Sequence, residues 1–252
     1  MGRFRAGATA AGSHGVTDRN VLVIGASGDV GQGIVRVALR DGWGVVAAAR
    51  TMDRLAGRLA EPRPGLAFCT GDLSTQEGAI ALWEGAMAAA GSIDAVVVSV
   101  NAPVRTAPLA QWSAEDIVAL FAANLLTHFV ATRVMLPRLP ASGLFIGIGG
   151  GTADFLLPGM APLSIVQAGL RMFYRGAARE IAGPAQVREL IINSMVNGPD
   201  KRAVARPEWL TDDDVGAHVC AILADPSVFP GPILQLHSRD QVGKPEYTAA
   251  KG

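Results

Sequence analysis

The chain has 252 residues, half of them hydrophobic, and its 22 basic and 22 acidic residues give a formal charge of zero. This length suits one α/β domain with a large core. The lack of a basic block argues against a nucleic-acid partner, and no apolar run approaches membrane-spanning length. We therefore expect a cytoplasmic globular protein, and zero net charge does not oppose its assembly into a homodimer or homotetramer.

The two ends of the chain differ in composition from the rest. The first twenty residues are small, polar and rich in glycine and alanine, without an apolar stretch of the signal-peptide type. We expect a disordered N-terminal arm over residues 1–19, a single domain over 20–240 and a C-terminal tail over 241–252.

The two cysteines, Cys69 and Cys220, lie far apart and lack the spacing of a metal site. One interpretation is a disulfide between them. We favour two buried thiols, because such a pair does not form a disulfide framework. No metal is expected.

Apolar runs alternate with segments of helical periodicity along the chain. Strands are predicted over Val21–Gly25, Gly44–Ala49, Leu66–Thr70, Ala95–Val100, Leu144–Ile148, Glu189–Ser194 and Pro232–Leu236. Helices are predicted over Val30–Leu39, Thr51–Leu59, Ser74–Ala90, Ser113–Leu136, Leu163–Ala182 and Thr211–Ala224. Continuous apolar strands fit a parallel sheet covered on both faces. The repetition predicts an α/β fold with one doubly wound parallel sheet of about seven strands.

A glycine motif joins the first predicted strand to the first predicted helix. Gly25 would permit a tight turn, Gly28 would let the backbone approach a pyrophosphate, and Gly31 would let helix and strand pack closely. Free N–H groups at the helix start would face the phosphates. The alternative is a turn without a ligand, but position, spacing and the β-α-β frame favour a nucleotide-binding Rossmann fold. The expected phosphate-binding residues are Gly25, Ser27, Gly28, Asp29, Val30 and Gly31.

The second predicted strand ends in Ala49-Arg50. An enzyme that uses NAD usually has an acid here to accept from the ribose 2′-hydroxyl, whereas a cation suits a 2′-phosphate. The guanidinium of Arg50 can bind phosphate bidentately, although it could also be a solvated surface group. The cofactor is therefore predicted to be NADP(H).

Several further motifs make the chain resemble the short-chain dehydrogenases/reductases over nearly all of residues 20–240. Asp72-Leu73 resembles the family's adenine-contacting pair, and Asn101-Ala102-Pro103 resembles its Asn-Ala-Gly turn. Asn124 resembles the helix asparagine that supports the proton relay. Asn197-Gly198-Pro199 resembles the Pro-Gly-Pro segment beside the nicotinamide. The resemblance implies that the cofactor also contacts Asp72, Leu73, Asn101, Ala102 and Pro199.

The resemblance breaks at the family's catalytic groups, a serine at the end of strand five and a Tyr-x-x-x-Lys pair on the next helix. The serine position falls on Gly150 or a glycine beside it. The tyrosine and lysine positions fall on Leu163 and Gln167, which offer neither a dissociable proton nor a charge. The chain is thus predicted to be a divergent member that lacks the catalytic trio.

The chain's two tyrosines do not restore the motif. Tyr174 would lie about 16 Å along the helix from Leu163, so we expect it to pack in the core. Tyr247 and Lys251 have the right spacing, but the strand–helix context is missing there and the match is interpreted as coincidence.

A few polar residues could replace the lost chemistry. Thr152 and Asp154 should lie near the substrate end of the sheet, and Asp154 could act as a base if burial raises its pKa. We favour a loop carboxylate bonded to backbone amides. His128 could titrate near neutrality, but a helix-interface role is favoured. The candidate catalytic residues are Asp154, Thr152 and Asn124.

Two cations, Lys201 and Arg202, follow the Asn197-Gly198-Pro199 segment. They could contact the pyrophosphate or an acidic substrate. Equally, they could be solvated charges on a flexible lid.

Three functions are compatible with these residues. The first is an NADP(H)-dependent oxidoreductase with an atypical proton relay, acting on a small apolar or weakly polar substrate. The second is a non-redox relative that serves as an NADP(H) sensor, a scaffold or a redox-neutral enzyme, as loss of the catalytic trio suggests. The third, a subunit that only binds partners, is disfavoured by the intact phosphate loop.

Overall fold

The computed structural model describes residues 19–59, 61–181 and 183–245. Its main sheet contains β1 (Asn20–Ile24), β2 (Gly44–Ala49), β3 (Leu66–Thr70), β4 (Ala95–Val98), β5 (Leu144–Gly150), β6 (Gln186–Ile192) and β9 (Ile233–Leu236). The strands are all parallel, in the order β3-β2-β1-β4-β5-β6-β9. The order reverses beside β1, which is where parallel α/β sheets bind ligands. The predicted doubly wound Rossmann fold is confirmed.

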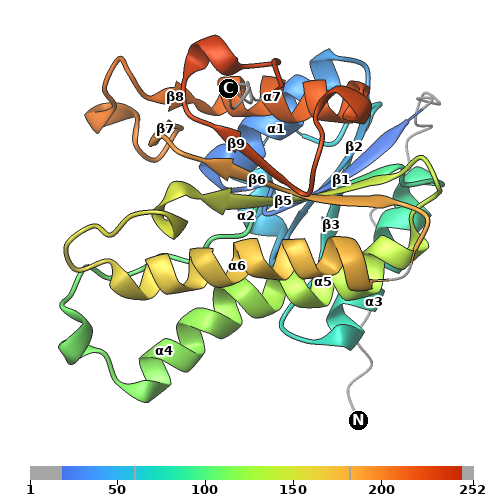
Figure 1. Cartoon of the computed structure of the whole chain (residues 1–252). Coiled ribbons are helices and arrows are strands. Elements are labelled where there is room, and N and C mark those ends of the chain that lie inside the picture. The colour runs from blue at the N-terminus through green and yellow to red at the C-terminus, as the bar shows by residue number, and fades with distance from the viewer. Residues whose placement is uncertain (1–18, 60, 182, 246–252) are drawn as a thin grey trace, which may run out of the picture.

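Helices cover both faces of the sheet (Figure 1). On one side lie α1 (Asp29–Arg40) and α7 (Asp212–Ala224), and on the other lie α3 (Gln76–Ala90), α5 (Thr127–Met135) and α6 (Ala161–Glu180). Each face buries its own apolar cluster, so the strands must be apolar on both sides. This is why β4 reads Ala-Val-Val-Val, with every residue buried.

The long helix predicted over Ser113–Leu136 is divided into three parts. It consists of α4 (Ala114–Phe121), a π-helical segment (Ala122–Leu126) and α5. A π-helical turn is wider than an α-helical one and is frequent at functional sites. Hydrophobic periodicity alone does not reveal such a change of pitch.

Two further differences concern short elements. The helix predicted over Thr51–Leu59 is only the five-residue α2 (Met52–Ala56), which ends at Gly57. A small parallel sheet of β7 (Val196–Asn197) and β8 (Leu210–Thr211) was not predicted, because two-residue strands have no periodicity to detect.

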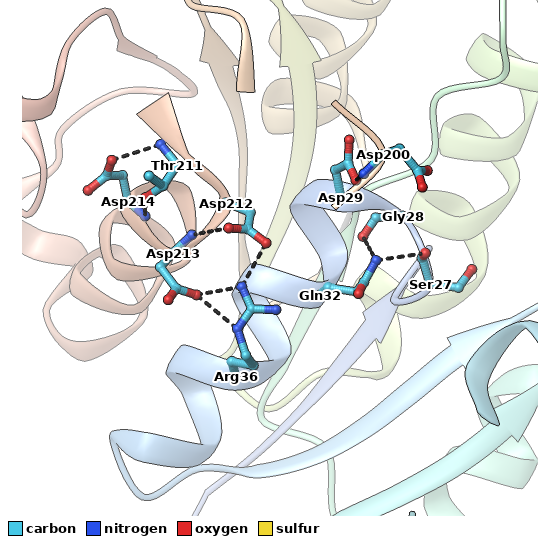
Figure 2. A network of polar contacts seen from close by, with 10 residues as sticks. All are labelled: Ser27, Gly28, Asp29, Gln32, Arg36, Asp200, Thr211, Asp212, Asp213 and Asp214. Carbon is cyan, nitrogen blue, oxygen red and sulfur yellow. Dashed lines mark hydrogen bonds and ion pairs between the residues drawn. The ribbon is translucent and has the colours of Figure 1, made fainter. Parts of the chain in front are cut away.

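The helices α1 and α7 cross with their backbones in contact. A Cβ on Gly33 would lie 2.0 Å from the backbone oxygen of Asp212. Next to this crossing, the guanidinium of Arg36 binds the carboxylates of Asp212 and Asp213, each at 2.7 Å (Figure 2). These contacts fix the helix whose first turn forms the candidate phosphate site.

The structure also bears on the predicted termini and thiols. Both Cys69 and Cys220 are free and buried, as expected. The predicted arm lies outside the described residues except for Arg19, whose guanidinium lies 4.4 Å from the centre of the Trp43 ring. Residues 246–252 of the predicted tail, with the Tyr247-to-Lys251 motif, also lie outside them.

One continuous helical run, Ala114–Arg138, is long and apolar enough to cross a membrane by length and composition alone. This corrects the expectation that no apolar run approaches that length. In this fold the run flanks the sheet between α3 and α6 (Figure 1), and 39% of its most apolar window is buried. A helix of a soluble core passes the same test, so the run is weak support for a membrane span.

Candidate functional site

The turn between β1 and α1 depends sterically on two glycines. Gly25 has a φ of +83°, and a Cβ on it would lie 2.2 Å from the carbonyl oxygen of Ser99, just after β4. A Cβ on Gly31 would lie 2.2 Å from the carbonyl oxygen of Gly25. The turn is therefore tight and the helix packs directly on it, as the glycine spacing predicts.

Gly28 occupies the N-cap position of α1 and, unlike Gly25 and Gly31, has no backbone atom in close contact with the position of a Cβ. The nearest atom to a Cβ built on it is the oxygen of Gly25, at 3.4 Å, so its outer side is open. The side chain of Gln32 donates to the carbonyl oxygens of Ser27 and Gly28 and braces the loop from within (Figure 2). The first N–H groups of α1 have no partners inside the helix, which makes this end of the helix suited to an anion.

Of two other predicted phosphate-loop residues, Val30 faces the core and Asp29 contacts the segment after β7. Val30 packs its partly buried side chain against the apolar cluster beneath α1. The carboxylate of Asp29 accepts hydrogen bonds from the backbone N–H of Asp200 and the ammonium of Lys201. The segment after β7 therefore lies on the first turn of α1, and Pro199 within it is partly buried.

The residues predicted to contact the adenosine end of the cofactor lie where β2 and β3 finish. Arg50 is exposed and makes no ion pair with any described residue, so its guanidinium is available to a ligand. Asp72 accepts hydrogen bonds from the backbone N–H and hydroxyl of Ser74, which lower the pKa of its carboxyl, as Arg50 does to a smaller extent. The following Leu73 is buried.

Asn124 holds the turn that follows β4. Its side chain is buried within the π-helical segment, where its amide donates to the Leu120 carbonyl oxygen at 2.9 Å. Its Oδ1 accepts from the backbone N–H of Ala102 at 2.8 Å, and Asn101 beside it is exposed. Asn124 thus positions the predicted nicotinamide-side residues, while its part in a proton relay stays a prediction.

The three positions of the family's catalytic groups come together in space. Gln167 is buried, and its Oε1 accepts from the backbone N–H of Gly150 at 2.7 Å. Leu163 lies one helical turn earlier and is half-buried. Glycine, leucine and glutamine cannot exchange a proton at these positions near neutral pH.

Asp154 does not have the raised pKa that a base would need. The guanidinium of Arg171 binds both of its carboxylate oxygens, with Nη2 at 2.6 Å from Oδ2. These hydrogen bonds are the largest cause of a lowered pKa. The structure corrects the expected backbone pairing as well, because Asp154 pairs with a side chain. Thr152 lies in the single turn Gly151–Ala153 just before it.

The interpretation of His128 and Tyr174 as buried packing residues is confirmed. The two side chains are fully buried, and the Nδ1 of His128 lies 2.8 Å from the hydroxyl of Tyr174. Its Nε2 lies 3.1 Å from the carbonyl oxygen of Val100. Burial lowers the pKa of His128 to about 4, so it stays neutral at physiological pH.

Sequence reasoning missed a buried carboxyl beside this site. Glu189 lies in the middle of β6, is 1% exposed, and its burial raises its pKa to about 8. Its Oε1 fills the space above Gly149, where a Cβ would lie 2.2 Å away. Its Oε2 has no partner among the described residues, and neither has Nε of Arg171. The signal that could have revealed it is an acid directly before the apolar residues Leu190–Ile192.

Known proteins with similar sequences are short-chain dehydrogenases or proteins related to them. The family model described as short chain dehydrogenase matches residues 19–199. The cyclic-di-GMP-binding biofilm dispersal mediator protein of Escherichia coli K12 is 29% identical over 184 residues, which are 73% of each chain. Serine 3-dehydrogenase of Agrobacterium fabrum is 26% identical over 168 residues, which are 65% of this chain and 66% of its own.

Solved structures with similar folds include ElxO with NADP bound (TM-score 0.76, 14% identity, 87% of this chain and 97% of that one). An alcohol dehydrogenase from Thermococcus sibiricus, complexed with 5-hydroxy-NADP, has a TM-score of 0.73 and 23% identity, over 91% and 99% of the two chains. A short-chain oxidoreductase of Pseudomonas aeruginosa PAO1, described as containing an atypical catalytic center, has a TM-score of 0.75 and 19% identity, over 88% and 96%. These likenesses establish the fold.

Proposed function

Because the chain belongs to the short-chain dehydrogenase family, we propose that it is an NADP(H)-binding oxidoreductase whose proton relay differs from the family's tyrosine–lysine pair. The family binds nicotinamide cofactors. The observation that carries the proposal is the turn at Gly25 and Gly31, which opens the first turn of α1 to an anion. Two fold neighbours, ElxO and the Thermococcus enzyme, have NADP or a derivative of it in their structures.

The preference for NADP(H) rests on Arg50. Its exposed guanidinium follows β2, where the adenosine ribose lies in Rossmann folds, and no acid precedes it to bind a 2′-hydroxyl. A guanidinium can hold a 2′-phosphate with two parallel hydrogen bonds, and it gains nothing comparable from a hydroxyl.

Titration of the purified protein with NADPH and NADH, followed by nicotinamide fluorescence, tests this preference. Arg50→Gln should weaken NADPH binding about tenfold or more and leave NADH binding unchanged, since one charged hydrogen-bonded contact is lost. The matched control is Arg179→Gln, which removes an exposed arginine at the far end of α6. Equal losses for both coenzymes would contradict a 2′-phosphate contact.

The cofactor would supply the hydride, and the chain would orient the reactants and exclude water. Leu163 and Gln167 give the reacting region an apolar side and a neutral amide in place of an acid. We therefore assign the proton to water or to the substrate itself, since Asp154 is ion-paired with Arg171. Such a site suits a small apolar or weakly polar substrate whose reduction places little demand on an acid, such as an activated alkene or an iminium ion.

Redox activity is tested by incubating bound NADPH with panels of carbonyl, enone and imine compounds and following its absorbance. Oxidation with enones or imines, and little with simple ketones, is the expected result. Unchanged absorbance with every panel would exclude the oxidoreductase proposal.

A redox-neutral binding protein is the second candidate function. The loss of proton-exchanging groups at Gly150, Leu163 and Gln167 favours it. The Escherichia coli relative is also named for binding cyclic di-GMP. Calorimetric titration with cyclic di-GMP, with and without NADPH, separates the two candidates, because an enzyme for small substrates should bind only the coenzyme.

We also propose a cytoplasmic homodimer or homotetramer, with no nucleic-acid or membrane partner. Large apolar side chains are exposed on the helical layer of α4, α5 and α6, including Val118, Phe129 and Met172. A second copy of this surface could cover them, since apolar patches on one helical layer favour self-association. Light scattering of the protein on a sizing column should give two or four times the chain mass.

A further inference from the structure

The segment Gly198–Lys201 lies directly on the first turn of α1. A Cβ on Gly198 would lie 2.3 Å from the Cβ of Asp29, so only glycine permits this contact. The backbone N–H of Asp200 donates to Oδ1 of Asp29 at 2.9 Å, and Figure 2 shows the two residues side by side next to Gly28. The ammonium of Lys201 lies 3.2 Å from Oδ2 of the same carboxylate. Asp29 therefore holds both the backbone and the charge of this segment.

A second ion pair ties the segment to the chain that follows α2. Arg58, which follows α2, places Nη1 2.5 Å from Oδ1 of Asp200. Hydrogen bonding to Asp200 is the main cause of a raised pKa of Arg58, and Asp29 contributes at longer range. Asp29, Arg58, Asp200 and Lys201 thus form one charge network that joins α1, α2 and the segment after β7.

The position of Asp29 is unfavourable for a protein that binds a dinucleotide. Its side chain is only 8% exposed, and it begins α1, where unpaired N–H groups and the helix dipole attract an anion. Among the described residues, its carboxylate accepts hydrogen bonds from Asp200 and Lys201 and not from these N–H groups, so it adds a negative charge beside them. A pyrophosphate bound at these N–H groups would be repelled by Asp29 and attracted by Lys201, whose ammonium lies 3.2 Å from the Asp29 carboxylate on the same helical turn.

We propose that Asp29 and Lys201 form a phosphate-operated latch on the segment Gly198–Lys201. In the free protein, Lys201 neutralises Asp29 and the segment is closed on α1. When a dinucleotide binds, the ammonium of Lys201 moves to the pyrophosphate, while the N–H of Asp200 stays on Asp29 and keeps the segment over the ligand. Lys201 is then a cofactor-phosphate ligand and Asp29 is its competitor. This inference rests on the dinucleotide site proposed above.

The test measures NADPH affinity in Asp29→Asn and Lys201→Met variants, with Lys244→Met as the control for loss of one exposed positive charge. Asp29→Asn removes the competing charge but keeps an oxygen for the N–H of Asp200, so NADPH should bind about tenfold more tightly. Lys201→Met should weaken NADPH about tenfold, as expected for one charged phosphate contact. Lys244→Met should bind as the wild type does. Adenosine 2′-monophosphate, which lacks the pyrophosphate, should bind all four proteins equally.

Hydrogen exchange of the amides in residues 198–204 distinguishes a latch from a fixed ion pair. Without ligand, exchange should be faster in both Asp29→Asn and Lys201→Met than in the wild type. NADPH should restore slow exchange in Asp29→Asn, where Lys201 can still reach the phosphate, but not in Lys201→Met. Exchange in β1, β4 and β5 should be the same in every variant, which excludes a general loss of folding.

The possible failures are distinct. If the wild type and every variant fail to bind NADPH and NADH, the proposed function is wrong and the latch falls with it. If all four proteins bind NADPH equally, the dinucleotide site stands and the latch is wrong. The latch is also wrong if NADPH slows exchange in Lys201→Met as much as in Asp29→Asn.

Discussion

Glycines do opposite things in the two parts of the site. At the turn after β1, Gly25 and Gly31 let backbone close on backbone, which leaves N–H groups free for an anion. Along β5, Gly147 and Gly149 instead leave space for polar side chains, the hydroxyl of Tyr174 and the carboxyl of Glu189. The first arrangement leaves the outer side of Gly28 open, where we propose that a ligand binds, whereas the second is filled by the protein's own side chains. The same residue type therefore forms a tight backbone turn in one place and makes room for buried polar side chains in another.

The largest effect should come from filling the backbone contact at the first region. Gly25→Ala adds a Cβ where the backbone is left-handed and the Ser99 oxygen is in contact, so it should cost about 4 kcal/mol of unfolding free energy. NADPH binding should be lost as well. Gly42→Ala is the control, because its φ is +85° but no atom lies within 4 Å of the added Cβ. It should cost only about 1 kcal/mol in urea unfolding. Equal losses of unfolding free energy in Gly25→Ala and Gly42→Ala would show that the contact with the Ser99 oxygen is not the cause.

A slightly smaller change in unfolding free energy is expected from Glu189, the buried carboxyl beside Gly149 of β5. Between pH 4.5 and about 8, Glu189 is ionised in the unfolded chain but protonated in the native protein, so its burial destabilises the fold increasingly as the pH rises. Glu189→Gln removes this penalty. It should raise the unfolding free energy by about 3 kcal/mol at pH 7 and by almost nothing at pH 4.

The control for that experiment is Glu180→Gln, which changes an exposed glutamate at the end of α6. It should have little effect at either pH. A gain from Glu189→Gln that is the same at pH 4 and pH 7 would show that the carboxyl ionises normally in the folded protein.

Restoring the family's pair should change activity rather than stability. Leu163→Tyr combined with Gln167→Lys places a proton donor where the family has one, and it should increase NADPH-dependent ketone reduction at least about tenfold. Leu163→Phe with Gln167→Lys is the matched control, because it adds the ring without the hydroxyl. A gain of equal size in both double variants would mean that ring packing, and not proton transfer, is responsible.

The smallest effect is expected at Asp154. Asp154→Asn should cost less than about 1 kcal/mol at pH 7, because the carboxylate is about half exposed and its pairing with Arg171 is screened by solvent. The contribution should disappear as the pH falls through the lowered pKa of Asp154, since the native state then loses its paired charge. Any reductase activity should survive. Loss of activity at unchanged NADPH affinity would restore Asp154 as the base.

The tight turn between β1 and α1 could be predicted because the residues that form it lie close together in the chain, and its binding of phosphate stays a prediction. Gly25, Gly28 and Gly31 lie within seven residues, and each follows a strand or begins a helix in a way that periodicity makes visible. The position of Arg50 directly after the second strand could be predicted in the same way, and its contact with a 2′-phosphate stays a prediction. The doubly wound sheet follows from the repeated apolar runs.

The rest depends on contacts that no local pattern contains. Asp29 meets Lys201 across 172 positions of the chain, and Glu189 meets Gly149 only because β5 and β6 pair in one particular register. The π-helical turn at Asn124 adds no hydrophobic signal of its own. The position of Asp154 after β5 follows from the sequence, but its partner Arg171 lies on α6 and lowers the pKa of Asp154, whereas a general base would need a raised pKa.

Gly150, the last residue of β5, has space beside it for a small side chain. The three atoms nearest to a Cβ there belong to the Gln167 amide, at 3.6 to 3.8 Å, whereas a Cβ on Gly149 or Gly151 would clash with Glu189 or Asn193. Its backbone is extended, with φ −120° and ψ 148°, which serine adopts readily. Protein engineers could therefore introduce a hydroxyl into this fold with the single substitution Gly150→Ser, without redesigning the strand around it.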